Sequence, residues 1–262
     1  SKKARNMNIS IIGVGNMGGA VARGLASRGK YNICVSDPST EKLDLLKGEF
    51  PDVETTTDNI EATRKADILI LVVKPWKVKD VIEEIKDEIP FRCKQLVSIA
   101  AGVTTGDVTE WLGCEMPVYY VIPNTAISIR RSMTFIAYKN ADAEQLETVK
   151  SIFGELGTTL VIEEKQMKAC MALASCGIAY AMRYVRANVE GAVELGISPS
   201  DATMITSNTM KGAAELLLST GNHPEAEIDK VTTPGGLTIK GLNALEANGF
   251  TNAVIEALKA SI

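Results

Sequence analysis

Three glycines near the start of the chain have the spacing of a phosphate-binding turn. Gly13, Gly15 and Gly18 form G-x-G-x-x-G directly after the β-branched residues 9–12 and before a segment with helical spacing. The first glycine permits a tight turn, the second lets the backbone approach a pyrophosphate, and the third lets the helix pack on the sheet. Amides at the helix N-terminus then face the anion. This context favours a dinucleotide site over a turn without a ligand.

An acidic residue, Asp37, follows a second β-branched run roughly twenty residues beyond these glycines. A carboxylate there can accept hydrogen bonds from the adenosine ribose, which would favour NADH over NADPH. Alternatively, Asp37 caps the next helix, with Pro38 at the first helical position. The two roles do not exclude each other, and the sequence favours both equally.

A second constellation lies near the other end of the chain, at residues 233–238. The sequence T-P-G-G-L-T precedes a helical run, and a proline and two glycines at a helix entrance leave several amides free. Such a nest suits a carboxylate, because the helix dipole favours negative charge there. Thr238 would place a hydroxyl beside that anion. In the alternative, Thr233 or Thr238 only caps the helix.

Candidates for acid–base or metal chemistry are few. The one histidine, His223, stands beside Pro224 in a predicted loop, where a histidine is usually solvated. The sequence has no H-x-x-x-H pair, clustered Cys/His set or G-x-S-x-G segment, so it predicts neither a metal site nor a serine hydrolase. Hydride transfer to an already protonated imine fits, because the cofactor supplies the reducing power and little proton relay is needed.

The elements that position these residues differ between two parts of the chain. From Met7 to about Val161, β-branched runs alternate with amphipathic segments, as in βαβ units around a parallel sheet. Residues 68–73 are continuously apolar, as expected for a central strand covered on both faces. The predicted strands are residues 8–12, 32–36, 68–72, 96–99, 118–121, 133–137 and 159–161.

After Glu163 the strand signals stop, and helical spacing continues with breaks at residues 196–199 and 222–224. We therefore predict an α/β fold. A Rossmann-like doubly wound sheet occupies residues 1–163 and binds the dinucleotide, and an all-helical C-terminal domain occupies residues 164–262. Small residues are frequent at 169–192, which suits either a core helix or a subunit interface, and we favour the interface.

Composition agrees with a folded protein that acts on small molecules. The 262 residues are 45% apolar and 23% charged, and a net charge of -4 argues against sequence-independent binding of nucleic acid. No stretch has the length and apolarity of a membrane span, and no signal-peptide core follows the basic residues 1–6. The scattered cysteines indicate reduced thiols in a cytoplasmic protein; they are Cys34, Cys93, Cys114, Cys170 and Cys176.

Taken together, these motifs resemble those of the pyrroline-5-carboxylate reductase family, from Met7 to the C-terminus. The family's G-x-G-x-M-G is met at residues 13–18 and its V-K-P at 73–75. Residues 122–125, I-P-N-T, resemble its M-P-N-T, and Asn59 looks like its ribose-contacting asparagine. Residues 98–103 look like its loop near the nicotinamide. The resemblance implies that NADPH or NADH contacts Gly13, Gly15, Asn16, Met17, Gly18, Asp37, Asn59, Val73, Lys74, Pro75 and Ala100.

The most specific match is V-T-x-P-G-G-x-T-I-x-G-L at residues 231–242. It implies that a hydride passes from the nicotinamide to C5 of pyrroline-5-carboxylate, giving L-proline in the last step of proline biosynthesis. Thr238 would then be the catalytic residue that hydrogen-bonds the ring nitrogen. The amides of Gly236, Leu237 and Thr238 would hold the carboxylate. The implied substrate-binding residues are Thr233, Gly235, Gly236, Leu237 and Thr238.

The glycine turn and the nest belong to different predicted domains, so we expect the site in a cleft between them. A homodimer or higher homo-oligomer through the helical domain is also expected. Three segments depart from the family pattern and leave room for an altered substrate. The family's S-G-S-G-P-A-Y is changed at residues 174–180, the proline after M-P-N-T is Ala126, and a glycine-containing turn reads Arg130-Arg131-Ser132.

Other functions remain possible for this two-domain plan. A β-hydroxyacid reductase would carry a catalytic lysine on the helix after the sheet domain, but residues 171–195 contain no lysine. Another imine reductase is a second alternative. A dinucleotide-sensing protein without turnover is a third, and it would leave the nest at residues 233–238 unexplained.

Overall fold

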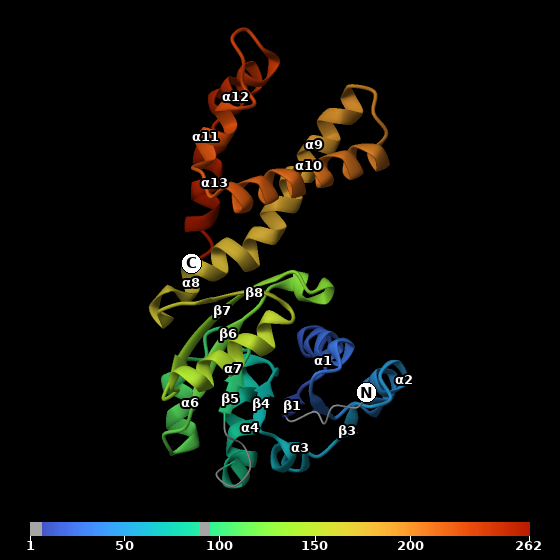
Figure 1. Cartoon of the computed structure of the whole chain (residues 1–262), viewed down its shortest axis with the longest axis vertical. Helices are drawn as coiled ribbons and strands as arrows, with labels where there is room; N and C mark the ends of the chain where they lie inside the picture. The colour runs from blue at the N-terminus through green and yellow to red at the C-terminus, as the bar shows by residue number, and fades with distance from the viewer. Residues whose placement is uncertain (1–6, 90–94) are drawn as a thin grey trace. The chain divides into compact units, whose positions relative to one another are not determined.

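The computed structural model describes residues 7–89 and 95–262. Cys93 and the basic segment 1–6, on which parts of the sequence predictions depend, lie outside these residues. The chain divides into two compact units, Ser1–Ser175 and Cys176–Ile262 (Figure 1). The first contains the sheet and the second contains only helices.

A single sheet forms the first unit, in the order β3-β2-β1-β4-β5-β6-β7-β8. All neighbouring strands pair in parallel except β6 and β7, which are antiparallel. The predicted Rossmann-like fold is confirmed, with one antiparallel pair, β6 and β7, in a mainly parallel sheet. The strands are β1 Asn8–Ile12, β2 Asn32–Ser36, β3 Glu54–Thr56, β4 Ile68–Leu71, β5 Gln95–Ser98, β6 Val118–Ile122, β7 Ser132–Lys139 and β8 Gly157–Val161.

Helices cover both faces of this sheet because alternate strand residues face opposite sides. In β4, Ile68 and Ile70 pack with α1 Asn16–Arg28, α2 Thr40–Glu49 and α7 Ala143–Gly154. Leu69 and Leu71 pack with α4 Val78–Ile85 and α6 Thr105–Leu112 on the other face. All four side chains are at most 2% exposed. The continuous apolar run therefore results from burial on both faces, as predicted.

Short elements complete the first unit. The helix α3 Asn59–Lys65 lies between β3 and β4, and 3₁₀ turns occur at η1 Pro75–Lys77, η2 Lys86–Glu88, η3 Thr125–Ile129 and η4 Glu164–Gln166. After β8 the chain continues through α8 Met167–Met171 and a π-helical turn, Ala172–Cys176. The boundary between the two units along the chain falls within this π turn, in one of the segments that depart from the family pattern.

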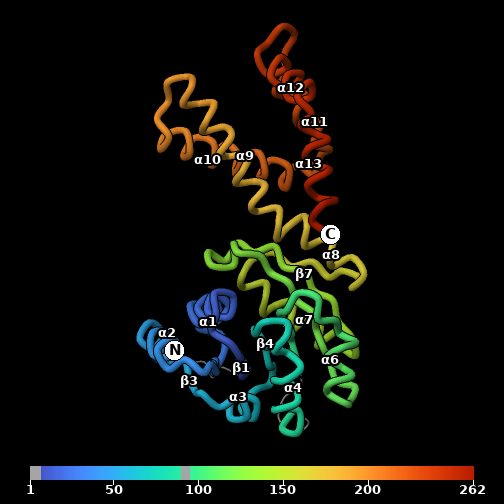
Figure 2. Tube along the Cα trace, turned by 180° about the vertical axis from the view of Figure 1, so that it is seen from behind, coloured from blue at the N-terminus to red at the C-terminus, as the bar shows by residue number. Residues whose placement is uncertain are grey.

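The second unit contains α9 Gly177–Glu194, α10 Pro199–Thr220, α11 Pro224–Asp229, α12 Leu237–Ala247 and α13 Phe250–Lys259. The predicted breaks before Pro199 and Pro224 are confirmed, because proline starts both following helices. Helices α9 and α10 lie side by side (Figure 2). Tyr184 of α9 meets Phe250 of α13 edge to face, with ring centroids 6.2 Å apart.

Within residues 176–262, all of them described, Val189 and Ala202 are the buried residues. Large apolar side chains are instead exposed, among them Leu195 at 85%, Leu218 at 85% and Leu237 at 84%. Amphipathic helices ordinarily bury such faces against another element. One copy of this unit therefore leaves much of its apolar surface without a partner. No helix in the described part of the chain has the length and apolarity needed to cross a membrane.

Candidate active site

The glycine turn after β1 is fixed by close backbone contacts. Gly13 has φ +108°, and a Cβ there would lie 2.2 Å from the Val72 carbonyl oxygen. A Cβ on Gly18 would lie 2.0 Å from the Gly13 carbonyl oxygen. Gly15, the N-cap of α1, differs because a Cβ on it would meet no atom within 4 Å. Two glycines therefore shape the turn, while the third leaves space beside the helix N-terminus.

That space belongs to a cavity of about 630 Å³ at the carboxyl ends of the parallel strands. All the predicted cofactor residues line it, although they come from the ends of several different strands. Their contact with a cofactor stays a prediction, but the fold brings them together at the edge where doubly wound sheets bind ligands. Ile99 and Ala101 also line it, from the segment 98–103 that the resemblance places near the nicotinamide. The other lining residues were not among the predicted cofactor residues: Ile12, Ser36, Pro38, Lys42, Val72, Lys77, Val81, Ile122, Pro123 and Met171.

The carboxylate of Asp37 connects the end of β2 to the glycine turn. Its Oδ2 accepts a hydrogen bond from the Val14 N–H at 2.8 Å, and its Oδ1 accepts one from the Ser39 N–H at 2.8 Å. Helix α2 begins at Thr40, and its N-cap is Ser39, whose Oγ accepts from the Lys42 N–H at 3.3 Å. The alternative in which Asp37 caps this helix is therefore wrong.

Asn59 is held in the cavity wall from both sides of its amide. The Ser36 hydroxyl donates to Asn59 Oδ1 at 2.7 Å, and Asn59 Nδ2 donates to Glu84 at 3.2 Å. Asn59 is the first residue of α3, whose N-cap is Asp58. The amide is thus fixed by its neighbours at the place where the family resemblance expects a ribose.

Charge in the lining of this cavity is mainly positive. Lys42, Lys74 and Lys77 line it, against the single carboxylate of Asp37. Lysines around a cleft raise the local concentration of anions. This balance, the open space at Gly15 and the helix N-terminus all fit the pyrophosphate of a dinucleotide.

The loop that carries Ala100 is held from two neighbouring elements. The Gly102 N–H donates to Oη of Tyr120 at 2.8 Å. Because Tyr120 lies in β6, this strand supports the loop. Burial raises the pKa of Tyr120, which keeps its hydroxyl neutral. The Glu164 carboxylate accepts from the Thr105 N–H at 2.7 Å and the Thr105 hydroxyl at 2.6 Å. Glu164, which follows the last strand of the sheet in the chain, therefore stabilises the segment next to the cavity.

The predicted carboxylate nest lies at the start of α12 in the second unit. Its N-cap is Gly236, and no side chain caps the helix, so the alternative in which Thr233 or Thr238 is a cap is wrong. The Gly236 N–H donates to the Thr233 carbonyl at 2.9 Å, which removes one of the three amides expected to bind the carboxylate. Leu237 and Thr238 remain, because first-turn amides have no intrahelical acceptor.

Glycine is required next to this nest. Gly235 has φ +72°, in the left-handed region, and a Cβ on Gly236 would lie 2.6 Å from Thr233 Oγ1. The Thr238 hydroxyl has no hydrogen-bond partner among the described residues. A free hydroxyl therefore stands beside two free amides, as the substrate role of this segment needs.

Other candidate groups have structural roles. His223 is the N-cap of α11, and its Nδ1 accepts from the Glu225 N–H at 3.0 Å, so it is more than a solvated loop residue. Among the described residues, no group of three or more His, Cys, Asp or Glu side chains could hold a metal ion. The four described cysteines are free thiols.

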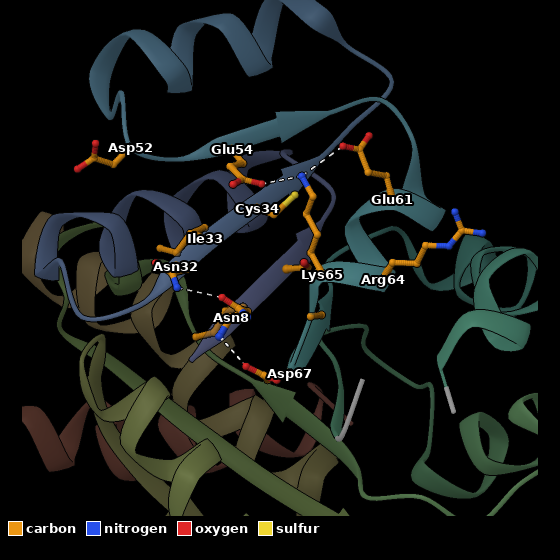
Figure 3. Close-up of a pocket in the computed structure, with 13 residues that line it drawn as sticks. Asn8, Asn32, Ile33, Cys34, Asp52, Glu54, Glu61, Arg64, Lys65 and Asp67 are labelled. Carbon is orange, nitrogen blue, oxygen red and sulfur yellow. Dashed lines mark hydrogen bonds and ion pairs between the residues drawn. The ribbon is translucent and has the colours of Figure 1, made fainter. Parts of the chain in front are cut away.

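A second cavity, of about 750 Å³, lies at the opposite ends of β1 and β2 (Figure 3). Lys65 contacts Glu54 at 2.7 Å and Glu61 at 3.3 Å, and Asp67 accepts from the Asn8 N–H at 2.9 Å. Burial raises the pKa of Cys34 to about 11, so its thiol is a poor nucleophile. These paired groups and the position away from the carboxyl ends of the strands argue against an active site here.

Comparison with known proteins agrees with this geometry. Residues 164–262 match the family described as pyrroline-5-carboxylate reductase dimerisation, and residues 8–102 match NADP oxidoreductase coenzyme F420-dependent. Pyrroline-5-carboxylate reductase 2 of Dictyostelium discoideum is 37% identical over 97% of this chain and 90% of its own length. The chain belongs to the pyrroline-5-carboxylate reductase family. The reductase of Methanosarcina acetivorans, 36% identical over 98% of this chain and 97% of its own, supports the same assignment.

Solved structures of the reductase family have the same fold. A pyrroline-5-carboxylate reductase from Coxiella burnetii is 34% identical, with a TM-score of 0.91 over 97% of this chain and 96% of that one. The Plasmodium falciparum reductase, solved with NADP bound, is 27% identical, with a TM-score of 0.85 over 98% of this chain and 96% of that one. The predicted family and fold are both confirmed.

Proposed function

We propose that this chain reduces 1-pyrroline-5-carboxylate to L-proline with NADPH or NADH, the last step of proline biosynthesis. The observation that carries the proposal is a likeness to named reductases over nearly the whole chain, at 37% identity in one case. The cavity beside the glycine turn supports it, since the predicted cofactor residues all line this cavity.

The residues of the first unit have distinct roles in holding the cofactor. The N-terminus of α1, opened by Gly15, receives the pyrophosphate. Asp37 and Asn59 contact the adenosine ribose, while Lys74 and Ala100 lie along the nicotinamide half. The reduced nicotinamide, when bound, supplies the hydride that the protein itself cannot provide.

The nest at α12 binds and orients the substrate. The Leu237 and Thr238 amides hold its carboxylate at the positive end of the helix dipole. The Thr238 hydroxyl hydrogen-bonds the ring nitrogen, which arrives protonated and leaves as an amine. A hydroxyl is too weak an acid to donate a proton at neutral pH, so Thr238 acts by position and electrostatics.

We also infer that the chain works as a homodimer or higher homo-oligomer in the cytoplasm. The family match that begins at residue 164 supports the predicted domain boundary at residues 163 and 164, whereas the compact units divide later, between Ser175 and Cys176. The exposed apolar side chains of Leu195, Leu218 and Leu237 support a partner for the helical unit. A second copy would bury such faces as an obligate interface does. Light scattering on the purified protein tests this, and a stable monomer at micromolar concentration would contradict it.

A steady-state assay tests the catalytic proposal. Racemic pyrroline-5-carboxylate is supplied with each cofactor in turn, and proline is measured directly as the product. Oxidation of a β-hydroxyacid by NAD or NADP, measured in parallel, tests the rival activity. Cofactor binding without turnover of either substrate would instead favour a dinucleotide sensor and end the proposal.

A further inference from the structure

A third cavity, of about 420 Å³, gathers three arginines from separate parts of the first unit. Arg28 ends α1, whereas Arg130 and Arg131 form the link between η3 and β7. The remaining wall comes from the start of β7, the end of α7, the link after it and the start of β8. We call this cavity the arginine pocket; its lining is Arg28, Arg130, Arg131, Ser132, Gly154, Glu155, Gly157 and Thr158.

The charges in the arginine pocket are not balanced. Its one carboxylate, Glu155, already contacts Arg28 at 2.8 Å and Lys30 at 2.5 Å. The hydrogen bond from Lys30, together with Arg28, lowers the pKa of Glu155. Arg130 and Arg131 form no ion pair within the part of the chain that the structure describes. Cationic charge is therefore in excess here, although the whole chain carries a net charge of -4.

This imbalance distinguishes the arginine pocket from the cavity in Figure 3. There, Lys65 pairs with two carboxylates, and Arg64 contacts Glu88 at 2.9 Å. Ionic groups that satisfy one another need no ligand. In the arginine pocket, Arg131 Nη1 donates to the Arg130 carbonyl oxygen at 3.3 Å, and neither Arg130 nor Arg131 has a carboxylate partner among the described residues. Guanidinium groups are strong donors whose geometry matches phosphate oxygens.

The backbone at Arg130 gives an independent indication. Arg130 has φ +57°, in the left-handed region that favours glycine. The Cβ of an arginine makes this conformation unfavourable, so the backbone conformation does not explain why an arginine is present at this position. Arg130 lines the arginine pocket, and this position gives a reason for its charged side chain.

We propose that the arginine pocket binds a small anion that carries two or more phosphate groups. Arg130 and Arg131 contact the phosphates, and Arg28 remains tied to Glu155. Two guanidinium groups without an ion pair among the described residues favour a multiply charged anion over a single carboxylate. The volume lies within the range of small-molecule sites, roughly 300–1,000 Å³. The arginine pocket and the cofactor cavity share no lining residue, so this site is separate from the proposed active site.

Calorimetric titration with inorganic pyrophosphate tests the proposal. The full-length protein is titrated alone and again with saturating NADPH, with sodium chloride at matched ionic strength as the control. With saturating NADPH, which fills the glycine turn, pyrophosphate binding at the arginine pocket is expected to persist, because the two cavities are distinct. Loss of pyrophosphate binding in the presence of cofactor would place the anion at the glycine turn and overturn the proposal.

Substitutions assign the binding to the arginine pocket. Arg130→Gly should weaken pyrophosphate binding by about ten- to hundredfold, and Arg131→Ala should do the same. The melting temperature of Arg130→Gly should not fall, because glycine suits the local φ. Arg130→Asn is a second variant that tolerates this conformation. Lys79 on α4 is exposed and does not line the arginine pocket. Lys79→Ala therefore removes one surface charge and should leave the affinity unchanged.

Each possible result bears on the proposal. A weaker affinity in the arginine variants, with normal melting temperatures and an unaffected Lys79→Ala protein, supports it. Unchanged affinity in Arg130→Gly and Arg131→Ala would overturn it. An equal loss in Lys79→Ala would also overturn it, because attraction by general charge would then explain the binding.

Discussion

The Val14 N–H donates a 2.8 Å hydrogen bond to Oδ2 of Asp37, so the residue after β2 supports the glycine turn after β1. The other oxygen accepts from the Ser39 N–H. Each carboxylate oxygen has a second lone pair, which leaves room for a ribose hydroxyl. Substitution of Asp37 should therefore change both the shape of the turn and the choice of cofactor.

Asp37→Asn should raise the ratio of catalytic efficiency with NADPH to that with NADH. The carboxylate repels the 2′-phosphate, and like charges about 4 Å apart interact by about 1–4 kcal/mol at effective dielectric constants between 80 and 20. Damage to the turn should affect both cofactors alike, so it cancels in the ratio. An unchanged ratio would mean that Asp37 supports the glycine turn through its hydrogen bond with Val14 and does not select the cofactor.

Gly15→Val should weaken cofactor binding without unfolding the protein. A Cβ at Gly15 meets no protein atom within 4 Å, but it enters the space assigned to the pyrophosphate. We expect the dissociation constant of the reduced cofactor to rise at least about tenfold, as followed by fluorescence titration. Gly18→Ala is the contrasting variant, because its Cβ would clash with the Gly13 carbonyl and lower the melting temperature.

Thr238→Ala should lower turnover while the fold stays intact. Loss of one hydrogen bond to the reacting nitrogen costs about 2–4 kcal/mol, or roughly one and a half to three decades in rate. The melting temperature should be steady, because the N-cap of α12 is Gly236 and the Thr238 hydroxyl bonds no described residue. Thr238→Ser should restore activity, and Thr209→Ala on α10 serves as the control. Near-normal turnover in Thr238→Ala would refute the catalytic role.

The acid stability of the protein should depend on Glu155. Its pKa in the folded protein is below the ordinary value of 4.5, chiefly through the hydrogen bond from Lys30. Its stabilising contribution is therefore present above pH 4.5 and is lost as the pH falls through the lowered pKa. Glu155→Gln should lower the free energy of unfolding at pH 7 by about 1 kcal/mol.

Denaturant unfolding at several pH values tests this dependence. The difference between the parent protein and Glu155→Gln should shrink below pH 4.5, because protonation removes the same charge. Glu147→Gln, an exposed residue on α7 paired with Lys150, should have a smaller effect. A difference that stays constant from pH 7 to pH 3 would contradict the role of the ion pairs.

Local sequence determined much of the first unit. The runs at residues 8–12 and 32–36 became strands with those bounds, because buried β-branched segments next to glycine or proline have few alternatives. The short strand β3 was not predicted, since its sequence E-T-T lacks an apolar run and its order comes from pairing with β2. The antiparallel direction of β7 likewise depends on its neighbour β6, which local patterns do not encode.

The sequence by itself determined the glycine turn, the helix breaks at proline and the presence of the P-G-G nest, because each depends on backbone freedom within a few residues. Only the tertiary structure decided how distant side chains combine. It decided that Asp37 accepts a hydrogen bond from the Val14 amide and that Asn59 accepts one from Ser36. It also paired Glu155 with Arg28, which is 127 residues away. Such pairs follow from strand order and helix packing, so no local spacing could predict them.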